Sequence, residues 1–310
     1  MSFNNGSKSS RRRIAGLVLA IFAACAARHH LFAATLPEPL ALGDKTGGVQ
    51  LVLYTVPSVN AARALNTFDV QAFGESLLGG PARGALSNVW DNVLINGHGA
   101  DPAITNSLPV LQRASGAEWE YAAVDVTPAY TNRLTRFHRH LLFVQPDLFV
   151  ICDELTAKEP AEVQFRLPSS VQPQVDVRWG SLGVAQPKAG LTVHCLVPGR
   201  RVPPPWKVWD ASGDLGSAVS KRWLAQTGPT NKVAELRLLT VLVPHRAGQE
   251  RSLAYKILES QNAIGARLYR DGLPALVAFR TEAAPGEASL GGLNFTGPVA
   301  VDVFHPKRKP

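Results

Sequence analysis

Two histidines separated by a single residue, His138 and His140, are the first candidates for chemistry in this sequence. Residues at positions i and i+2 of a β-strand share a face, so the two imidazoles are expected to point the same way. Imidazoles placed in this way can chelate a metal, and zinc needs a third ligand such as Asp125 or His98. The divalent metals that we consider are zinc and calcium. The alternative is a polar strand face that His138 and His140 share with Arg136. No motif requires a cofactor.

A second group of residues has the composition of a sugar-binding site. Aromatic rings stack on the C–H face of a sugar, while neighbouring arginine, amide and carboxylate groups bond its hydroxyl and acidic groups. The aromatic members are Trp90, Trp119, Tyr121 and Tyr130, and the polar residues that we predict to bind substrate are Asp91, Asn92, Arg136 and Arg139, together with Trp90. Aromatic residues also build the cores of β-sandwiches, and this alternative stays open.

Several function classes lack support. The chain has no glycine-rich nucleotide fingerprint, no CxxC pair, no HExxH and no GxSxG motif. The formal net charge is +8, but five basic residues precede Thr35 with no acidic residue among them. The charge that remains after that segment is too modest to indicate a nucleic-acid partner.

The elements that would position these residues are short strands. Apolar, β-branched and aromatic runs alternate with turns, and Gly (26) and Pro (23) are spread along the chain instead of clustered. The central runs are Trp90–Gly99, Trp119–Tyr130 and Arg136–Glu154. About fourteen strands without a long helical period predict an all-β fold, a large antiparallel β-sandwich over residues 49–306.

The N-terminal segment resembles an export signal. Arg11 to Arg13 precede an apolar run from Ile14 to Ala24, too short to span a bilayer. We expect residues 1–34 to be a signal peptide or an uncleaved N-terminal anchor, so that the protein is exported to the periplasm or cell envelope, or secreted. A twin-arginine signal and a lipoprotein box at Cys25 are alternatives. Residues 35–48 read as a linker, and residues 307–310 as a basic tail.

Beyond this segment the cysteines are Cys152 and Cys195. Both lie in strand-like runs, where a free cysteine is commonly a small buried hydrophobe. A disulfide between them is possible in an oxidising compartment, and sequence does not decide the matter.

A set of motifs resembles the C-terminal β-sandwich domain of heparinase II/III-like polysaccharide lyases. The matching stretches are FDVQAFGESLL at 68–78, NVLINGHGADP at 92–102, WEYAAVDVTPAY at 119–130, FVQPDLFVICDEL at 143–155 and QFRLPSS at 164–170. The resemblance implies an exported protein related to enzymes that cleave uronic-acid polysaccharides by β-elimination. In that reaction a base removes the proton next to the carboxylate, and an acid protonates the leaving oxygen.

The sequence departs from the family pattern where chemistry is expected. Asp91 stands where the family has a histidine before Asn92, Ala62-Arg63-Ala64 replaces a His-x-Asp pair, and a further family histidine falls on Pro168. Asp125 and Tyr130 match. About 15 residues separate the signal from the first strand, so we expect no helical toroid, the domain where much of the family's catalytic machinery lies.

We therefore predict a lyase-related sandwich that is non-catalytic alone. It would bind acidic polysaccharide or pair with a protein that supplies the toroid. The first alternative is a working lyase with a rearranged site, in which His98, Tyr130 and His138 are the catalytic candidates. The second is a structural envelope protein. A nucleic-acid partner is not expected.

Overall fold

The structure, a computed structural model, describes residues 38–44, 48–56, 65–79, 92–197, 204–212, 222–250, 253–270, 273–281 and 286–303. The predicted export segment and basic tail, Trp90 and Asp91 lie outside these ranges. The fold below is that of the unit from Pro39 to Pro310. Within the described ranges, no helix has the length and apolar character needed to cross a membrane.

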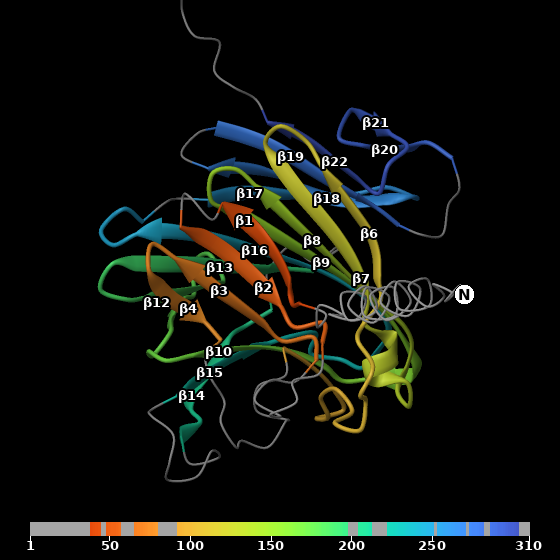
Figure 1. Ribbon diagram of the computed structural model, residues 1–310, viewed down its shortest axis with the longest axis horizontal. Coiled ribbons are helices and arrows are strands. Elements are labelled where there is room, and N and C mark those ends of the chain that lie inside the picture. The colour runs from red at the N-terminus through yellow and green to blue at the C-terminus, as the bar shows by residue number, and fades with distance from the viewer. Residues whose placement is uncertain are drawn as a thin grey trace, which may run out of the picture. The chain divides into compact units, whose positions relative to one another are not determined.

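A central antiparallel sheet runs through the molecule (Figure 1). Its order is β11-β12-β13-β16-β9-β8-β7-β6, and side chains of its long inner strands are buried on both faces of the sheet. Both faces are apolar because both are covered by other sheets. The strands are β6 (Val110–Ser115), β7 (Trp119–Asp125), β8 (Leu134–Val144), β9 (Leu148–Ala161), β11 (Gln174–Asp176), β12 (Ser181–Ala185), β13 (Ala189–Leu196) and β16 (Val233–Arg246).

Two smaller sheets cover one face of the central sheet. Phe143, Phe149 and Leu191 of the central sheet share a buried core with Leu51 of the first small sheet and Phe165 of the second. The first contains β1 (Leu40–Asp44), β2 (Val49–Leu53), β3 (Phe68–Ala72) and β4 (Glu75–Leu78), and the second contains β14 (Lys207–Asp210), β15 (Trp223–Thr227), β10 (Val163–Ser169) and β5 (Val93–Ile95). Burial of these faces supplies the main driving force for folding.

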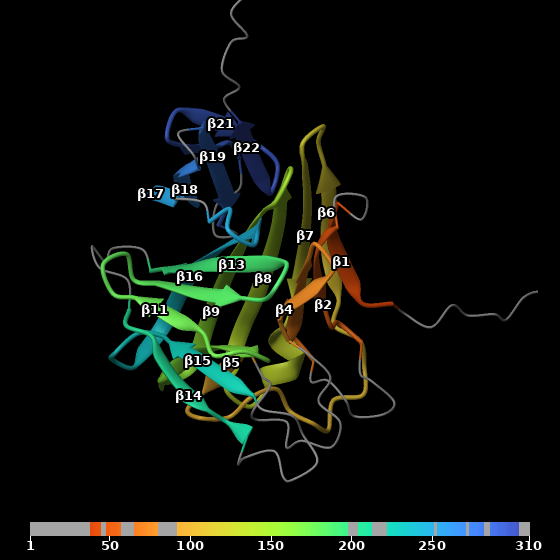
Figure 2. The same ribbon diagram turned by 90° about the vertical axis from the view of Figure 1, so that its left-hand side faces the viewer.

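The opposite face packs against a C-terminal sheet, which lies on the far side of the central strands from β10 and β15 (Figure 2). Val150 and Val241 meet Ile264 and Phe279 in this second core. The C-terminal sheet contains β17 (Leu253–Glu259), β18 (Ala263–Arg270), β19 (Leu273–Arg280) and β22 (Val299–Val303), and the hairpin of β20 (Ala288–Leu290) and β21 (Leu293–Phe295) packs on its outer face.

The predicted all-β antiparallel sandwich is confirmed, and two local expectations need correction. The expected linker at 35–48 contains β1, because Leu40 and Leu42 alternate with half-exposed residues and are buried against the core. Strand β6 was not anticipated, because its residues are mostly exposed and lack an apolar run.

The two cysteines remain free thiols within the described part of the chain. Cys152 belongs to the core beneath the C-terminal sheet, and Cys195 belongs to the core on the other face. Their side chains therefore point to opposite faces of the central sheet, so the disulfide considered from the sequence does not form here. Burial raises the pKa of the Cys195 thiol to about 12, which keeps it protonated and unreactive.

Candidate functional site

Strand β8 carries four of the residues that the sequence singled out. Arg136, His138 and His140 share the face that turns toward the C-terminal sheet, as their spacing predicted, and His140 there contacts the ring of Phe279. Arg139 points to the opposite face, where it meets Asp153. The predicted substrate-binding arginines Arg136 and Arg139 therefore lie on different sides of the central sheet.

His140 is held inside the protein by an aromatic and acidic environment. The Tyr121 hydroxyl lies 2.8 Å from His140 Nδ1, and the two rings stack. His140 Nε2 is 3.8 Å from Glu154 Oε2, a distance typical of an ion pair without a hydrogen bond. His140 is 4% exposed and Tyr121 is 2% exposed, so neither group can reach a polysaccharide in this conformation.

Glu154 lies at the centre of a charged cluster. Arg136 and Arg237 each approach its carboxylate at 3.3 Å, and Arg237 also pairs with Glu259 on β17. Burial alone would raise the pKa of Glu154, but His140, Arg136 and Arg237 together hold that pKa below its ordinary value. A pocket of about 420 Å³ opens beside these groups. Its two guanidinium groups already have carboxylate partners, so it offers little free positive charge.

Two of the three predicted metal ligands, His138 and Asp125, lie close together. His138 Nε2 is 3.7 Å from Asp125 Oδ1, and the two residues are directly opposite on β8 and β7. His140 shares their face of the sheet but is engaged with Tyr121. Within the described ranges, no group of three His, Cys, Asp or Glu side chains is placed to hold a metal ion.

His98 lies apart from this cluster, in the turn after β5. Asn96 and Gly97 both have positive φ angles, as a tight two-residue turn requires, and Ile95 pairs with His98 across it. His98 is exposed. It belongs to a different sheet from His138, so the structure gives the two histidines separate surroundings.

Asn92 and Arg139 hold sheets together. Asn92 accepts a hydrogen bond from the Phe68 amide at 2.7 Å and donates one to the Arg166 carbonyl at 2.9 Å, which joins β3 to β10. Arg139 has no exposed surface and donates to both oxygens of Asp153. This geometry favours a structural role for both residues. Their substrate-binding role stays a prediction from the sequence.

Tyr130 has a similar internal role. It ends the short 3₁₀ helix Thr127–Tyr130, is 1% exposed, and donates its hydroxyl to the Val93 carbonyl at 2.8 Å. We expect Tyr130→Phe to lower the free energy of unfolding by about 1–2 kcal/mol, because the buried carbonyl of Val93 loses its donor. Urea denaturation measures this change. Unchanged stability together with lost function would instead indicate a catalytic hydroxyl.

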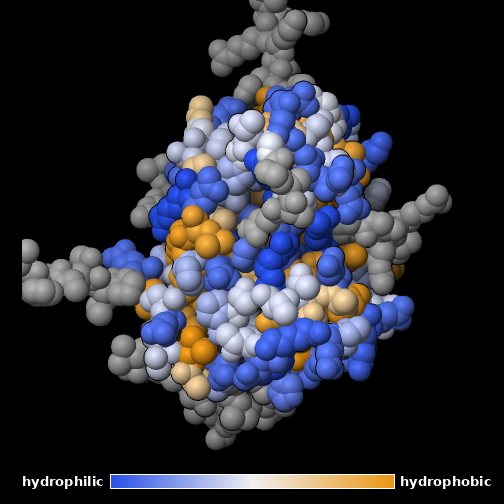
Figure 3. Space-filling model, turned by 90° about the vertical axis from the view of Figure 1, so that its right-hand side faces the viewer, coloured by the Kyte–Doolittle hydropathy of each residue, from blue (hydrophilic) through white to orange (hydrophobic). Residues whose placement is uncertain are grey.

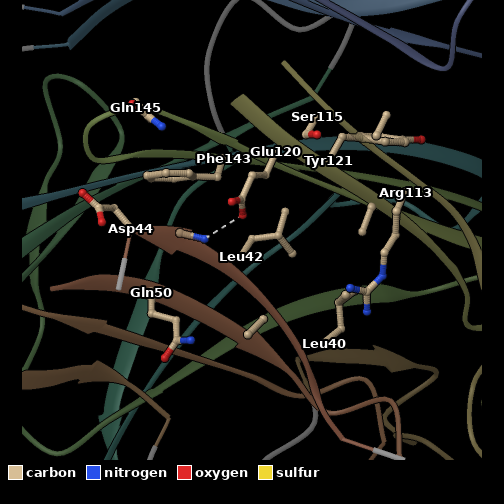
Figure 4. Close-up of a pocket in the computed structure, with 14 residues that line it drawn as sticks. Leu40, Leu42, Asp44, Gln50, Arg113, Ser115, Glu120, Tyr121, Phe143 and Gln145 are labelled. Carbon is tan, nitrogen blue, oxygen red and sulfur yellow. Dashed lines mark hydrogen bonds between the residues drawn. The ribbon is translucent and has the colours of Figure 1, made fainter. Parts of the chain in front are cut away.

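A larger groove, of about 650 Å³, lies between β1 and the β6–β7 hairpin (Figure 4). Leu40, Leu42 and Phe143 line it but are almost fully buried in the core, and the Glu120 carboxylate accepts a hydrogen bond from the Gly43 amide at 3.2 Å. Further polar side chains line it: Asp44, Gln50, Arg113, Ser115 and Gln145. These hydrogen-bonding groups suit the hydroxyls of a sugar chain.

Arg113 is the distinctive cation of this groove. It is exposed on β6 and makes no hydrogen bond or ion pair with any residue that the structure describes. It is thus available to an external anion, unlike Arg136 and Arg139. Sequence reasoning missed it because β6 lacks an apolar run. The signal that could have found it is the stretch Val110–Ser115, which follows a proline and directly precedes the predicted strand at Trp119.

Solved structures of known enzymes share this architecture. A heparinase III matches with a TM-score of 0.58 and 14% identity, over 80% of this chain and 43% of that chain. The heparan sulfate lyase HepC from Pedobacter heparinus matches with a TM-score of 0.58 and 13% identity, over 83% of this chain and 47% of that chain. The chain has the fold of part of a heparinase III. The resemblance seen in the sequence motifs is thereby confirmed at the level of fold.

The heparinase III-like sandwich spans less than half the length of these enzymes. No protein-family model matches its sequence, and neither does any curated protein. At such low identity the likeness establishes the fold, and the residues of this chain must carry any functional argument.

Proposed function

We propose that this protein is an exported, heparinase III-like β-sandwich that binds acidic polysaccharide and does not cleave it alone. The observation that carries the proposal is the structural match to heparinase III and heparan sulfate lyase over about four fifths of the chain. Export rests on the basic and apolar pattern of residues 1–34. A partner that carries a helical toroid stays a prediction of the resemblance.

The groove beside β1 supports binding. It presents amide, hydroxyl and carboxylate groups, and Arg113 offers its guanidinium without a competing partner in the described part of the chain. A planar guanidinium forms paired hydrogen bonds with a carboxylate or sulfate oxygen pair. Arg113 can therefore bind the carboxylate or sulfate of an acidic sugar, although Asp44 and Glu120 line the same groove with negative charge.

The surroundings of the catalytic candidates support the absence of cleavage. The Tyr130 hydroxyl is bonded inside the core, His138 is paired with Asp125, and His98 lies in a separate turn. Elimination needs an acid and a base that converge on one sugar ring. Tyr130 belongs to the core on one face of the central sheet, His138 lies on the opposite face, and His98 lies in the turn after β5.

The direct test uses the purified full chain with heparan sulfate and alginate. Absorbance of the unsaturated product follows cleavage, and titration calorimetry follows binding. We expect binding without turnover. Turnover that His138→Ala or Tyr130→Phe abolishes in a folded protein would establish the rearranged lyase instead. Absence of both binding and turnover would favour a structural envelope role.

We expect Arg113→Ala to weaken glycan binding about tenfold, because a hydrogen-bonded charge contributes about 1.5–3 kcal/mol and solvent screening reduces this at an exposed site. Titration with heparan sulfate at low and high salt measures the effect. Gln112→Ala is the matched control, since Gln112 is the next residue on β6 and points to the other face. Equal affinities for the two variants would indicate that the glycan does not bind in this groove.

A further inference from the structure

A turn on the opposite edge of the central sheet exposes large apolar side chains. Val177 is 86% exposed and Trp179 is 61% exposed, the highest values among the large hydrophobic residues that the structure describes. Both lie in the turn 177–180 between β11 and β12. By contrast, the face seen in Figure 3 shows small hydrophobic groups separated by polar residues. An exposed tryptophan beside a second exposed apolar residue commonly marks an interaction site.

This turn is held by a local hydrogen bond at its start and is anchored to the core at its end. The Arg178 amide donates to Asp176 Oδ1 at 2.9 Å, which fixes the start of the turn. The indole of Trp206 donates to the Gly180 carbonyl at 3.0 Å, and Trp206 is itself 8% exposed and part of the core. The tryptophan at the tip is therefore presented from a fixed backbone, which lowers the entropic cost of binding.

The hydrogen bond from the Trp206 indole to the Gly180 carbonyl brings the turn next to β14. Trp206 precedes that strand, and Val208 packs on the core, so Lys207 and Trp209 point the other way. The Arg166 guanidinium lies 5.6 Å from the ring centre of Trp209, within range for a cation–π contact. Lys207 is exposed and Trp209 is half-buried.

Two cationic side chains of this surface have no hydrogen-bond or ion-pair partner among the described residues. Arg178 and Lys207 are both exposed. Asp176 and Asp210 are also exposed and keep their negative charges, and each accepts a backbone amide hydrogen bond at 2.9 Å, from Arg178 and Ser212 respectively. The aromatic–basic strip is defined here as Arg178, Trp179, Lys207 and Trp209.

We propose that the aromatic–basic strip is a second contact site for an acidic polysaccharide, separate from the groove beside β1. Trp179 and Trp209 would stack on the C–H faces of sugar rings, while Arg178 and Lys207 bind carboxylate or sulfate groups. The inference rests on the proposed glycan binding and adds a second site to it. Because β11 and β6 are the two edges of the central sheet, a long glycan is needed to contact both sites.

The test measures the affinity of the full chain for long and short heparan sulfate fragments. We expect Trp179→Ala to weaken binding of the long fragment about tenfold, equivalent to about 1.4 kcal/mol, and Trp179→Tyr to restore most of it. Val177→Ser is the matched control, because it removes an exposed apolar group from the same turn without removing a stacking ring. Circular dichroism verifies that each variant is folded.

The outcomes separate this inference from the proposed function. If the unaltered chain binds no acidic glycan, both are overturned. If it binds, and Arg113→Ala weakens binding while Trp179→Ala does not, the second site is overturned and the groove stands. Equal losses for Val177→Ser and Trp179→Ala would also contradict the strip, because they would indicate a general apolar contact instead of ring stacking.

Discussion

Replacing Arg139 with methionine is expected to lower the free energy of unfolding by about 3–5 kcal/mol, because the substitution leaves Asp153 charged and unpaired in the core. Arg139 donates to the two Asp153 oxygens at 2.7 and 2.9 Å and to the Asn66 carbonyl at 2.9 Å. Its guanidinium also lies between the rings of Phe68 and Phe137. The change is measured by urea denaturation, with circular dichroism as the probe.

The matched control for this prediction removes both charges. Arg139→Met with Asp153→Leu leaves no uncompensated carboxylate, so we expect it to recover most of the lost stability. Arg113→Ala, which alters an exposed arginine without a partner in the described ranges, should change stability by less than about 0.5 kcal/mol. A stable Arg139→Met variant with reduced glycan affinity would contradict the structural role and restore the predicted substrate-binding role.

The fold could be predicted because its signal is distributed over many residues. Continuous apolar runs such as Leu148–Ile151 and the Gly and Pro turns indicate strands, because burial on both faces of the central sheet makes its inner strands apolar throughout. Weakly apolar strands were harder to predict. Strand β6 is mostly exposed, and β1 is short and surrounded by Pro and Gly, so neither stood out from its loops.

The candidate site was harder to predict than the fold, because the type of a residue does not reveal how deeply its side chain is buried. Arg136 and Arg139 were both predicted to bind substrate, but they lie on opposite faces of β8, and both faces are covered by other sheets. Tyr121 and Tyr130 matched a sugar-binding composition, yet the hydroxyl of each forms a hydrogen bond with an internal partner. Whether such a side chain is buried and paired depends on partners that are far apart in sequence.

Lowering the pH from 7 to 5 is expected to reduce the stability of the protein by about 2 kcal/mol through His194 alone. His194 is 3% exposed, its ring packs against Tyr255, and its ring nitrogens have no hydrogen-bond partner among the described residues. Burial lowers its pKa from 6.5 to about 4, although Asp176 acts in the opposite direction. The unfolded chain therefore takes up a proton between pH 6.5 and 4 while the folded chain resists it.

The sign of this effect follows from the direction of the pKa shift. Stability is fully present above pH 6.5, is lost progressively as the pH falls toward 4, and then levels off for this group. Measurements between pH 5 and 7.5 stay above the range where Glu154, whose pKa is also lowered, contributes its own loss. His194→Leu should flatten the profile and raise stability at pH 5, because a buried imidazole without partners is replaced by an apolar group. If the slope of stability against pH were unchanged in that variant, other groups would cause the pH dependence. His194 would then have to gain a proton as easily in the folded chain as in the unfolded one.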